Sequence, residues 1–201
     1  MKIVLASNNK HKIEEISSIV KGYEILPMSE VGYKDDIEEN GTTFYENALI
    51  KAKAVYEFLK NKNKDYIVVS DDSGLCVEAL DGRPGIYSAR YSGEHGNNKE
   101  NRKKLLSEMK DKINRNAYFN CTMVAILPSG EIIEAVGRTY GEIMTEEKGS
   151  NGFGFDSLFY YPPFKKTFAQ IQEEEKNSVS HRSKACHALF DKLQKIDKIE
   201  H

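Results

Sequence analysis

Short apolar runs alternate with helical repeats of apolar residues along the first part of the chain. Residues 2–6 form an apolar run that predicts a buried opening strand. After a polar turn, Ile13, Ile16 and Val20 recur at helical spacing and predict a helix. Residues 22–40 are acidic and strand-poor. The strand, turn and helix together indicate an α/β fold.

A second helix and a second buried strand follow. Thr43 and Glu46 fit a capping box at the start of this helix. Its apolar stripe consists of Phe44, Ala48, Ala52, Val55 and Leu59. Residues 66–69 predict a buried strand that ends at residues 70–74, and residues 75–80 fit a further short strand.

Glycines and apolar spacing divide the rest of the chain. Four glycines and a proline predict a long surface loop over residues 82–96. A helix is expected over residues 98–113 and another from residue 178 onward. Residues 117–127 and 131–140 predict two strands that a Pro-Ser-Gly turn joins into an antiparallel hairpin. The residues expected to face inward are Leu105, Leu106, Met109 and Ile113 in the first helix and Ala185, Leu189, Leu193 and Ile196 in the last.

Neither an internal repeat nor a linker interrupts the pattern, so residues 1–201 are expected to form one domain. Its two lobes would surround a mixed central sheet flanked by helices. Apolar residues make up 39% of the chain and charged residues 30%, which is typical of a globular protein. The 29 basic and 31 acidic residues give a formal charge of -2, whereas proteins that coat polymer phosphates carry a basic excess. We therefore expect a small-molecule ligand and no nucleic acid polymer as partner.

The spacing of the cysteines and the length of the apolar runs indicate the cellular location of the protein. Cys76, Cys121 and Cys186 are far apart and lack metal-ligand spacing, which is typical of reduced thiols in a cytoplasmic protein. Apolar runs stay well below the roughly 20 residues of a membrane span. The amino terminus also becomes polar too soon for a secretory signal. A cytoplasmic protein without a membrane partner is expected.

The first chemical motif is Ser7-Asn8-Asn9-Lys10-His11-Lys12, between a predicted strand and a helix amino terminus. Backbone N–H groups at a helix start lack intrahelical partners, and the helix dipole is positive there, so anions bind readily. The hydroxyl, the two amides and the lysines add further donors. The alternative is a plain helix cap followed by surface lysines.

The second motif is Asp71-Asp72-Ser73-Gly74, directly after a buried strand. Adjacent carboxylates at a strand end suit a hard cation or a general base. Consecutive strand residues face opposite ways, so only one of the two needs to point into a site. An Asx turn that ends the strand is the alternative. Glu39 and Glu46 are further carboxylate candidates, with solvation and helix capping as their respective alternatives.

The third group lies in the last quarter of the chain. Gly152-Phe153-Gly154-Phe155-Asp156 places aromatic rings between glycines, which lets a ring stack on a nucleobase. The alternative is a tight loop whose phenylalanines plug the core. Lys176, His181 and Arg182 offer a cation for phosphate and donors for a base edge. Their alternative is a basic first turn of the last helix, although the dipole disfavours cations there.

These segments together resemble the inosine triphosphatase family, the dITP/XTP pyrophosphatases of the Ham1 and RdgB type. The resemblance extends from residue 2 to about residue 193. The motifs that carry it are Leu5-Ala6-Ser7-Asn8-Asn9-Lys10-His11-Lys12, Ser70-Asp71-Asp72-Ser73-Gly74-Leu75, Pro84-Gly85-Ile86-Tyr87-Ser88-Ala89-Arg90-Tyr91, Gly152-Phe153-Gly154-Phe155-Asp156 and Ser180-His181-Arg182. A common variant of the first has a small residue and glycine where this chain has Ser7-Asn8-Asn9.

The resemblance implies an activity and a set of site residues. It implies a homodimer with substrate in a cleft between two lobes, and Mg²⁺-dependent hydrolysis of ITP, dITP and XTP to monophosphate and pyrophosphate. That reaction cleanses the nucleotide pool of deaminated purines. By position, Glu39 and Asp72 would hold the metal, with Asp72 also the base for the attacking water. The phosphate-binding residues would be Ser7, Asn8, Asn9, Lys10, His11, Lys12 and Lys176. The remaining substrate-binding residues would be Ser73, Phe153, Gly154, Phe155, Asp156, His181 and Arg182.

Two other functions compete with this interpretation. A Maf-like nucleotide pyrophosphatase would carry a Ser-Pro-Arg-Arg run where this chain has Asn8-Asn9-Lys10-His11. A nucleotide-sensing module would bind without turnover, and the paired carboxylates Asp71 and Asp72 would then be superfluous. Release of pyrophosphate from ITP separates an enzyme from a sensor.

Overall fold

Seven strands form one mixed sheet in the part of the chain that the computed structural model describes, residues 2–20, 22–62 and 66–197. Their order is β2-β1-β3-β4-β5-β6-β7. The chain divides into two compact units: unit 1 holds residues 1–72, 121–137 and 182–201, and unit 2 holds residues 73–120 and 138–181. The predicted α/β class with a mixed sheet is confirmed. The single domain over residues 1–201, with a cleft between two lobes, stays a prediction.

Unit 1 begins with three parallel strands. β1 (Lys2–Leu5) pairs with β2 (Glu24–Pro27) on one side and with β3 (Ile67–Val77) on the other. Residues 22–40 were predicted to be strand-poor, and the strand β2 within them was not predicted individually. It lies at the edge of the sheet, has four residues and is only partly buried, so it lacks the apolar run of a central strand.

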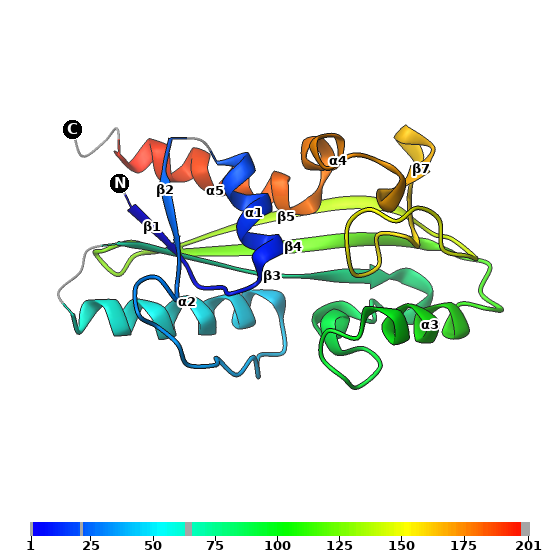
Figure 1. Cartoon of the computed structure of the whole chain (residues 1–201), viewed down its shortest axis with the longest axis horizontal. Helices are drawn as coiled ribbons and strands as arrows, with labels where there is room; N and C mark the ends of the chain where they lie inside the picture. The colour runs from blue at the N-terminus through cyan, green and yellow to red at the C-terminus, as the bar shows by residue number, and fades with distance from the viewer. Residues whose placement is uncertain (1, 21, 63–65, 198–201) are drawn as a thin grey trace. The chain divides into compact units, whose positions relative to one another are not determined.

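Helices cover both faces of these strands. Helices α1 (Lys10–Ile19) and α5 (His181–Asp197) lie on one face and α2 (Phe44–Lys60) on the other (Figure 1). Alternate residues of β1 supply the two cores, because successive strand side chains point to opposite faces. Ile3 and Leu5 pack with α1 and α5, whereas Val4, together with Ala6 just after the strand, packs with α2.

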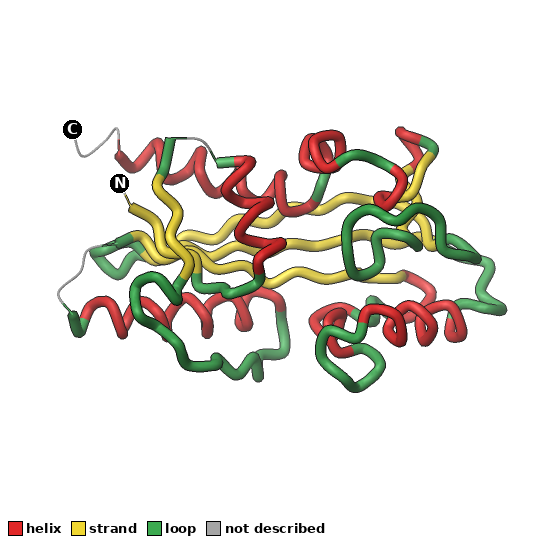
Figure 2. The backbone as a smooth tube through the Cα atoms, viewed as in Figure 1, coloured by secondary structure: helices red, strands yellow, loops and turns green. Residues whose placement is uncertain are grey.

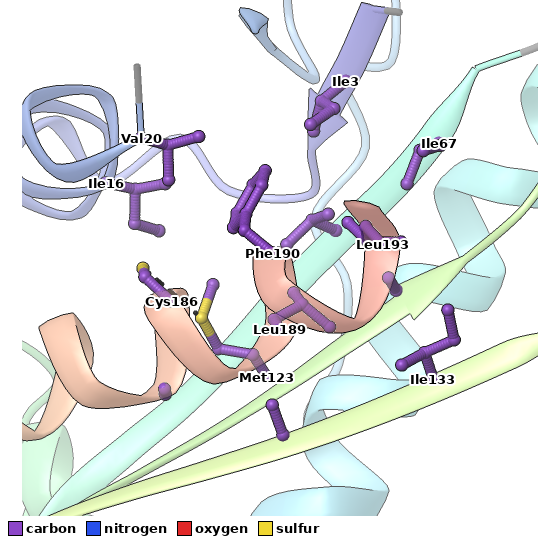
Figure 3. Packing of buried hydrophobic residues seen from close by; sticks show 14 of the residues in the cluster. Ile3, Ile16, Val20, Ile67, Met123, Ile133, Cys186, Leu189, Phe190 and Leu193 are labelled. Carbon is purple, nitrogen blue, oxygen red and sulfur yellow. Dashed lines mark hydrogen bonds between the residues drawn. The ribbon is translucent and has the colours of Figure 1, made fainter. Parts of the chain in front are cut away.

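The core on the α5 side is built around that helix's apolar stripe. Figure 3 shows Leu189, Phe190 and Leu193 among Ile3, Ile16 and Ile67, which come from three other elements. The inward positions Ala185, Leu189 and Leu193 are buried as predicted, and Ile196 packs against the same cluster.

The predicted hairpin is present. β4 (Asn116–Ile126) and β5 (Ile132–Ile143) are sheet neighbours, and the N–H of Leu127 donates to the carbonyl of Glu131 at 2.9 Å to close the turn. β6 (Phe159–Tyr161) pairs antiparallel with β5, and β7 (Lys166–Thr167) pairs antiparallel with β6.

In unit 2, α3 (Asn98–Glu108) covers one face of the strands (Figure 2). Leu105 and Met109 are fully buried as predicted, but Ile113 is 99% exposed. The helix ends at Glu108, with Met109 as its cap, so the helical spacing that placed Ile113 inward no longer applies. The short 3₁₀ helices are η1 (Glu78–Leu80), η2 (Gly85–Arg90), η3 (Pro162–Phe164) and η4 (Phe168–Gln170).

The carboxyl-terminal part contains two helices where one was predicted from residue 178. Helix α4 (Glu173–Val179) ends at Ser180, whose extended backbone interrupts the helix before α5 starts at His181. Among the described residues, every helix is too short or too polar to cross a bilayer.

Candidate active site

Strand β3 runs without interruption through the acidic pair. The sequence predicted a strand end at residues 70–74, yet β3 continues for 11 residues to Val77, so the Asx-turn alternative is wrong. Gly74 does not serve a turn. A Cβ there would overlap the carbonyl oxygen of Gly85 and lie 2.6 Å from Ser88 Oγ, so glycine is needed for close packing of η2 on the strand.

The two carboxylates of the pair face opposite sides of the sheet. Asp71 Oδ2 lies 3.1 Å from Lys12 Nζ and 3.6 Å from Arg182 Nε, on the side of α1 and α5. Asp72 Oδ2 accepts a hydrogen bond of 3.1 Å from Asn47 Nδ2 of α2, on the other side. The alternation of strand side chains therefore assigns the two residues to different environments.

Asp71 is the centre of a buried ionic cluster. Its side chain is 0% exposed and that of Arg182 is 2% exposed. Burial alone would raise the pKa of Asp71, but the charges of Lys12 and Arg182 outweigh it and hold the pKa well below its ordinary value. Arg182 also pairs with Glu15 of α1. Arg182 is therefore not a solvated helix residue, and the cluster joins α1, β3 and α5 within unit 1.

Asp72 has the opposite electrostatic character. Burial is the largest influence on it and raises its pKa, while Lys51 and Lys12 oppose that effect. The carboxylate of Glu39 raises the pKa further. A carboxylate with a raised pKa is a better proton acceptor for water than an ordinary exposed one.

The carboxylates of Glu39 and Glu46 have different partners: Glu39 forms an ion pair, whereas Glu46 caps a helix. Glu39 Oε1 lies 3.1 Å from Lys51 Nζ, and Lys51 also acts electrostatically on Asp72. Glu46 is exposed and accepts from the N–H of Thr42 at 2.6 Å, while its own N–H donates to Thr43 Oγ1 at 3.1 Å. The capping interpretation of Glu46 is confirmed, with its carboxylate on Thr42 instead of Thr43.

The carboxylates of Glu39 and Asp72 have the donor chemistry that Mg²⁺ requires. Mg²⁺ in phosphate-transferring sites commonly takes one or two carboxylates, with water and substrate phosphates completing the octahedron. Among residues 2–20, 22–62 and 66–197 no group of three or more acidic, histidine or cysteine side chains is arranged to hold an ion. The two carboxylates fit an ion that is shared with a phosphate substrate, because that number of carboxylates is the usual protein contribution in such sites.

The segment from Ser7 to Lys12 connects β1 to α1. Asn9 caps the helix, and its side chain accepts from the N–H of Lys12 at 3.4 Å. Ser7 Oγ accepts from the N–H of Asn9 at 3.1 Å. Asn8, Asn9, Lys10 and His11 are exposed. The loop presents polar side chains and the first turn of a helix at the carboxyl end of a parallel strand, a common place for phosphate.

The glycine loop, residues 149–156, has a tightly defined backbone. Gly152 and Gly154 have φ values of 73° and 61°, which favour glycine. The N–H of Phe153 donates to Asp156 Oδ2 at 3.0 Å. Phe153 is half-buried, whereas Phe155 is buried in the hydrophobic cluster of unit 2. The core-plug alternative thus describes Phe155, and Phe153 is the ring at the surface of the loop.

Lys176 and His181 lie beside aromatic rings. Lys176 Nζ is 2.7 Å from Asp156 Oδ2 and 4.9 Å from the centroid of Phe153. His181 stacks on Phe119 with a centroid distance of 4.8 Å and an interplanar angle of 15°. The structure therefore brings the predicted lysine to the glycine loop.

The predicted residues separate into two groups. Unit 1 holds Ser7, Asn8, Asn9, Lys10, His11, Lys12, Glu39, Asp72 and Arg182, and unit 2 holds Ser73, Phe153, Gly154, Phe155, Asp156, Lys176 and His181. Glu15, Asn47 and Lys51 were not predicted as site residues from the sequence. Each is a buried polar residue beside the apolar stripe of its helix, and that position was the available signal.

Comparison with known proteins gives consistent matches over nearly the whole chain. The model of the Ham1 family matches residues 3–192. A "dITP/XTP pyrophosphatase" of Clostridium perfringens is 48% identical over 97% of this chain and 98% of that protein. One of Campylobacter jejuni subsp. doylei is 50% identical over 92% of this chain and 93% of its own length.

Solved structures agree with these matches. The Staphylococcus aureus Ham1 protein superposes with a TM-score of 0.85 at 39% identity and covers 100% of both chains. A HAM1 protein from Coxiella burnetii superposes with a TM-score of 0.87 at 34% identity, covering 97% of this chain and 99% of that one.

Proposed function

The chain belongs to the Ham1 family, and from this premise we propose that it hydrolyses ITP, dITP and XTP to the monophosphate and pyrophosphate. This reaction removes deaminated purines from the nucleotide pool. The observation that carries the proposal is the position of Asp72, a buried carboxylate with a raised pKa beside Glu39 and Lys51. A sensing module would have no use for such a base.

The chain's residues have distinct parts in the reaction. Residues 7–12 bind the phosphates through backbone N–H groups and side-chain donors. Asp72 accepts a proton from the water that attacks the α-phosphorus, and Asn47 orients its carboxylate. The bond between the α-phosphorus and the bridging oxygen breaks, and pyrophosphate leaves. Mg²⁺ bound by Glu39 and Asp72 would neutralise triphosphate charge and favour ionisation of water.

Stacking of the purine base is assigned to the glycine loop of unit 2. Phe153 offers a half-buried ring for stacking, and Gly154 lets the backbone approach a planar ligand. His181 and Arg182 are proposed to favour the 6-oxo group of hypoxanthine and xanthine over the 6-amino group of adenine. Arginine only donates hydrogen bonds, so it suits an oxo acceptor. Lys176 is proposed to bind phosphate.

The assembly and location are part of the same proposal. A homodimer is consistent with the exposed tyrosine Tyr140 of unit 2, a residue that is 62% exposed. The ring centroids of Tyr140 and Tyr118 lie 5.5 Å apart. A cytoplasmic location suits the three cysteines, which are free and buried. Burial raises the pKa of the Cys186 thiol to about 12, so that thiol is unreactive near neutral pH.

A nucleotide panel tests the proposed specificity. We expect kcat/KM for ITP, dITP and XTP to exceed that for ATP by about 10- to 100-fold, because a 6-amino group would leave a buried donor facing a donor. CTP and UTP should be as poor as ATP, since a pyrimidine ring stacks less surface on Phe153. The measurement is initial rates of pyrophosphate release at matched Mg²⁺. Equal kcat/KM for ITP and ATP would contradict base selection.

A further inference from the structure

A polar contact network joins α3 to the glycine loop within unit 2. Arg102 Nε lies 2.8 Å from Glu147 Oε2, and Arg102 Nη1 donates to the carbonyl oxygen of Gly154 at 3.0 Å. Glu147 Oε2 also accepts from Ser157 Oγ at 3.0 Å. The guanidinium of Arg102 therefore binds a carbonyl inside the glycine loop and the carboxylate of Glu147, which precedes the loop. That carboxylate also accepts a hydrogen bond from Ser157, which follows the loop.

These contacts surround a cavity of about 160 Å³. It is lined by Arg102, Glu147, Gly149, Ser150, Asn151, Gly152, Phe153, Gly154, Asp156 and Ser157. Arg102 is thus the one lining residue that comes from a helix distant in the sequence, and its side chain is 20% exposed. A partly buried guanidinium on a carbonyl and a carboxylate makes charge-assisted bonds that bulk water weakens only in part.

The loop has a second anchor on Phe153. The N–H of Phe153 donates to Asp156, and Lys176 holds Asp156 at 2.7 Å. Glycine-rich backbone loses much conformational entropy when it is ordered. A loop that is already ordered before a ligand arrives binds the ligand more tightly, because binding then loses less conformational entropy.

We propose that Arg102 is a positioning residue for base binding. It fixes the carbonyl of Gly154, and thereby orients the Phe153 ring on which the purine would stack. This inference rests on the proposed function and deepens it. Arg102 acts through the loop and not on the phosphates, so it governs the affinity for the nucleoside part of the substrate.

The test is steady-state kinetics of the full chain with Arg102→Leu. KM for ITP is expected to rise about tenfold, while kcat stays within about twofold of the wild-type value. This pattern arises when a variant loses binding that the substrate and the transition state share equally. The inhibition constant of inorganic pyrophosphate, which has no base, should stay unchanged. Lys103→Leu is the matched control, because Lys103 lies on the same helix in an exposed pair with Glu100. Its kinetics should equal those of the wild type.

Two further variants keep the test decisive if Arg102→Leu folds poorly. Arg102→Lys keeps the positive charge but lacks the planar guanidinium that can bind two acceptors at once. Its KM for ITP should therefore lie between the values of the wild type and of Arg102→Leu. Glu147→Gln should raise KM several-fold, and adding it to Arg102→Leu should raise KM less than the product of the single effects.

The proposal is overturned if KM for ITP in Arg102→Leu equals that of Lys103→Leu. It is also overturned if the pyrophosphate inhibition constant rises in step with KM, since the effect would then not be specific to the base. The proposed function fails separately, through absence of pyrophosphate release by the wild type. In that case calorimetric titration of wild type and Arg102→Leu with IMP still measures the contribution of Arg102: about tenfold weaker binding supports it and equal binding refutes it.

Discussion

Asp72→Asn is expected to lower kcat for ITP by about 10²- to 10⁴-fold, because asparagine keeps the shape of the side chain but accepts no proton from water. The fold should tolerate the change. Burial raises the pKa of Asp72, so the folded state holds its carboxylate ionised less favourably than the unfolded chain does. Removing that charge should leave the free energy of unfolding equal or higher. Activity and stability thus separate at this residue.

Kinetics and denaturant unfolding on one preparation measure both effects. Asp111→Asn is the matched control, since Asp111 is an exposed carboxylate in the turn after α3. It should change neither quantity. Turnover by Asp72→Asn close to that of the wild type would remove Asp72 from the mechanism.

Asp71→Asn is expected to affect mainly stability and not turnover. It should lower the free energy of unfolding by about 3–5 kcal/mol. The substitution leaves Lys12 and Arg182 without the buried carboxylate that offsets their charges. The variant's kcat, measured where it is folded, should fall less than that of Asp72→Asn, because Asp71 faces the other side of β3. The control is Glu24→Gln, which removes an exposed 3.3 Å pair with Lys2 and should cost under about 1 kcal/mol.

The pH dependence of stability provides a second measure of Asp71. Its pKa in the folded protein is held below the ordinary value. Its contribution is therefore fully present above an unfolded pKa of about 4 and is lost as the pH falls below it. Between about pH 5 and pH 2 the wild type should lose stability more steeply than Asp71→Asn. Equal slopes for the two proteins would show that Asp71 is not held ionised by its neighbours.

The elements with strong apolar spacing were predictable from the sequence. Helix α2 and the hairpin of β4 and β5 follow from periodicity alone, because their buried faces repeat over several turns or pleats. Strand β2 was missed because an edge strand of four residues has no such repeat. The break at Ser180 was missed because its helix-breaking backbone is set by local geometry and not by composition.

The candidate site was predictable in its residue types and less so in their partners. Alternation of strand side chains anticipated that Asp71 and Asp72 would differ. Which of them is paired with cations depends on α1 and α5, whose residues are distant in the sequence. The pairing of Lys51 with Glu39 was not predictable for the same reason, because the two residues meet only in the fold.

The products formed from ITP in water enriched in oxygen-18 test the central claim most directly. If Asp72 activates water for attack on the α-phosphorus, each ITP should yield one IMP and one pyrophosphate, with the heavy oxygen in the IMP. The same mixture with excess chelator should show no turnover, since Glu39 and Asp72 would lack the divalent ion. Release of orthophosphate, or heavy oxygen in the pyrophosphate, would contradict the account.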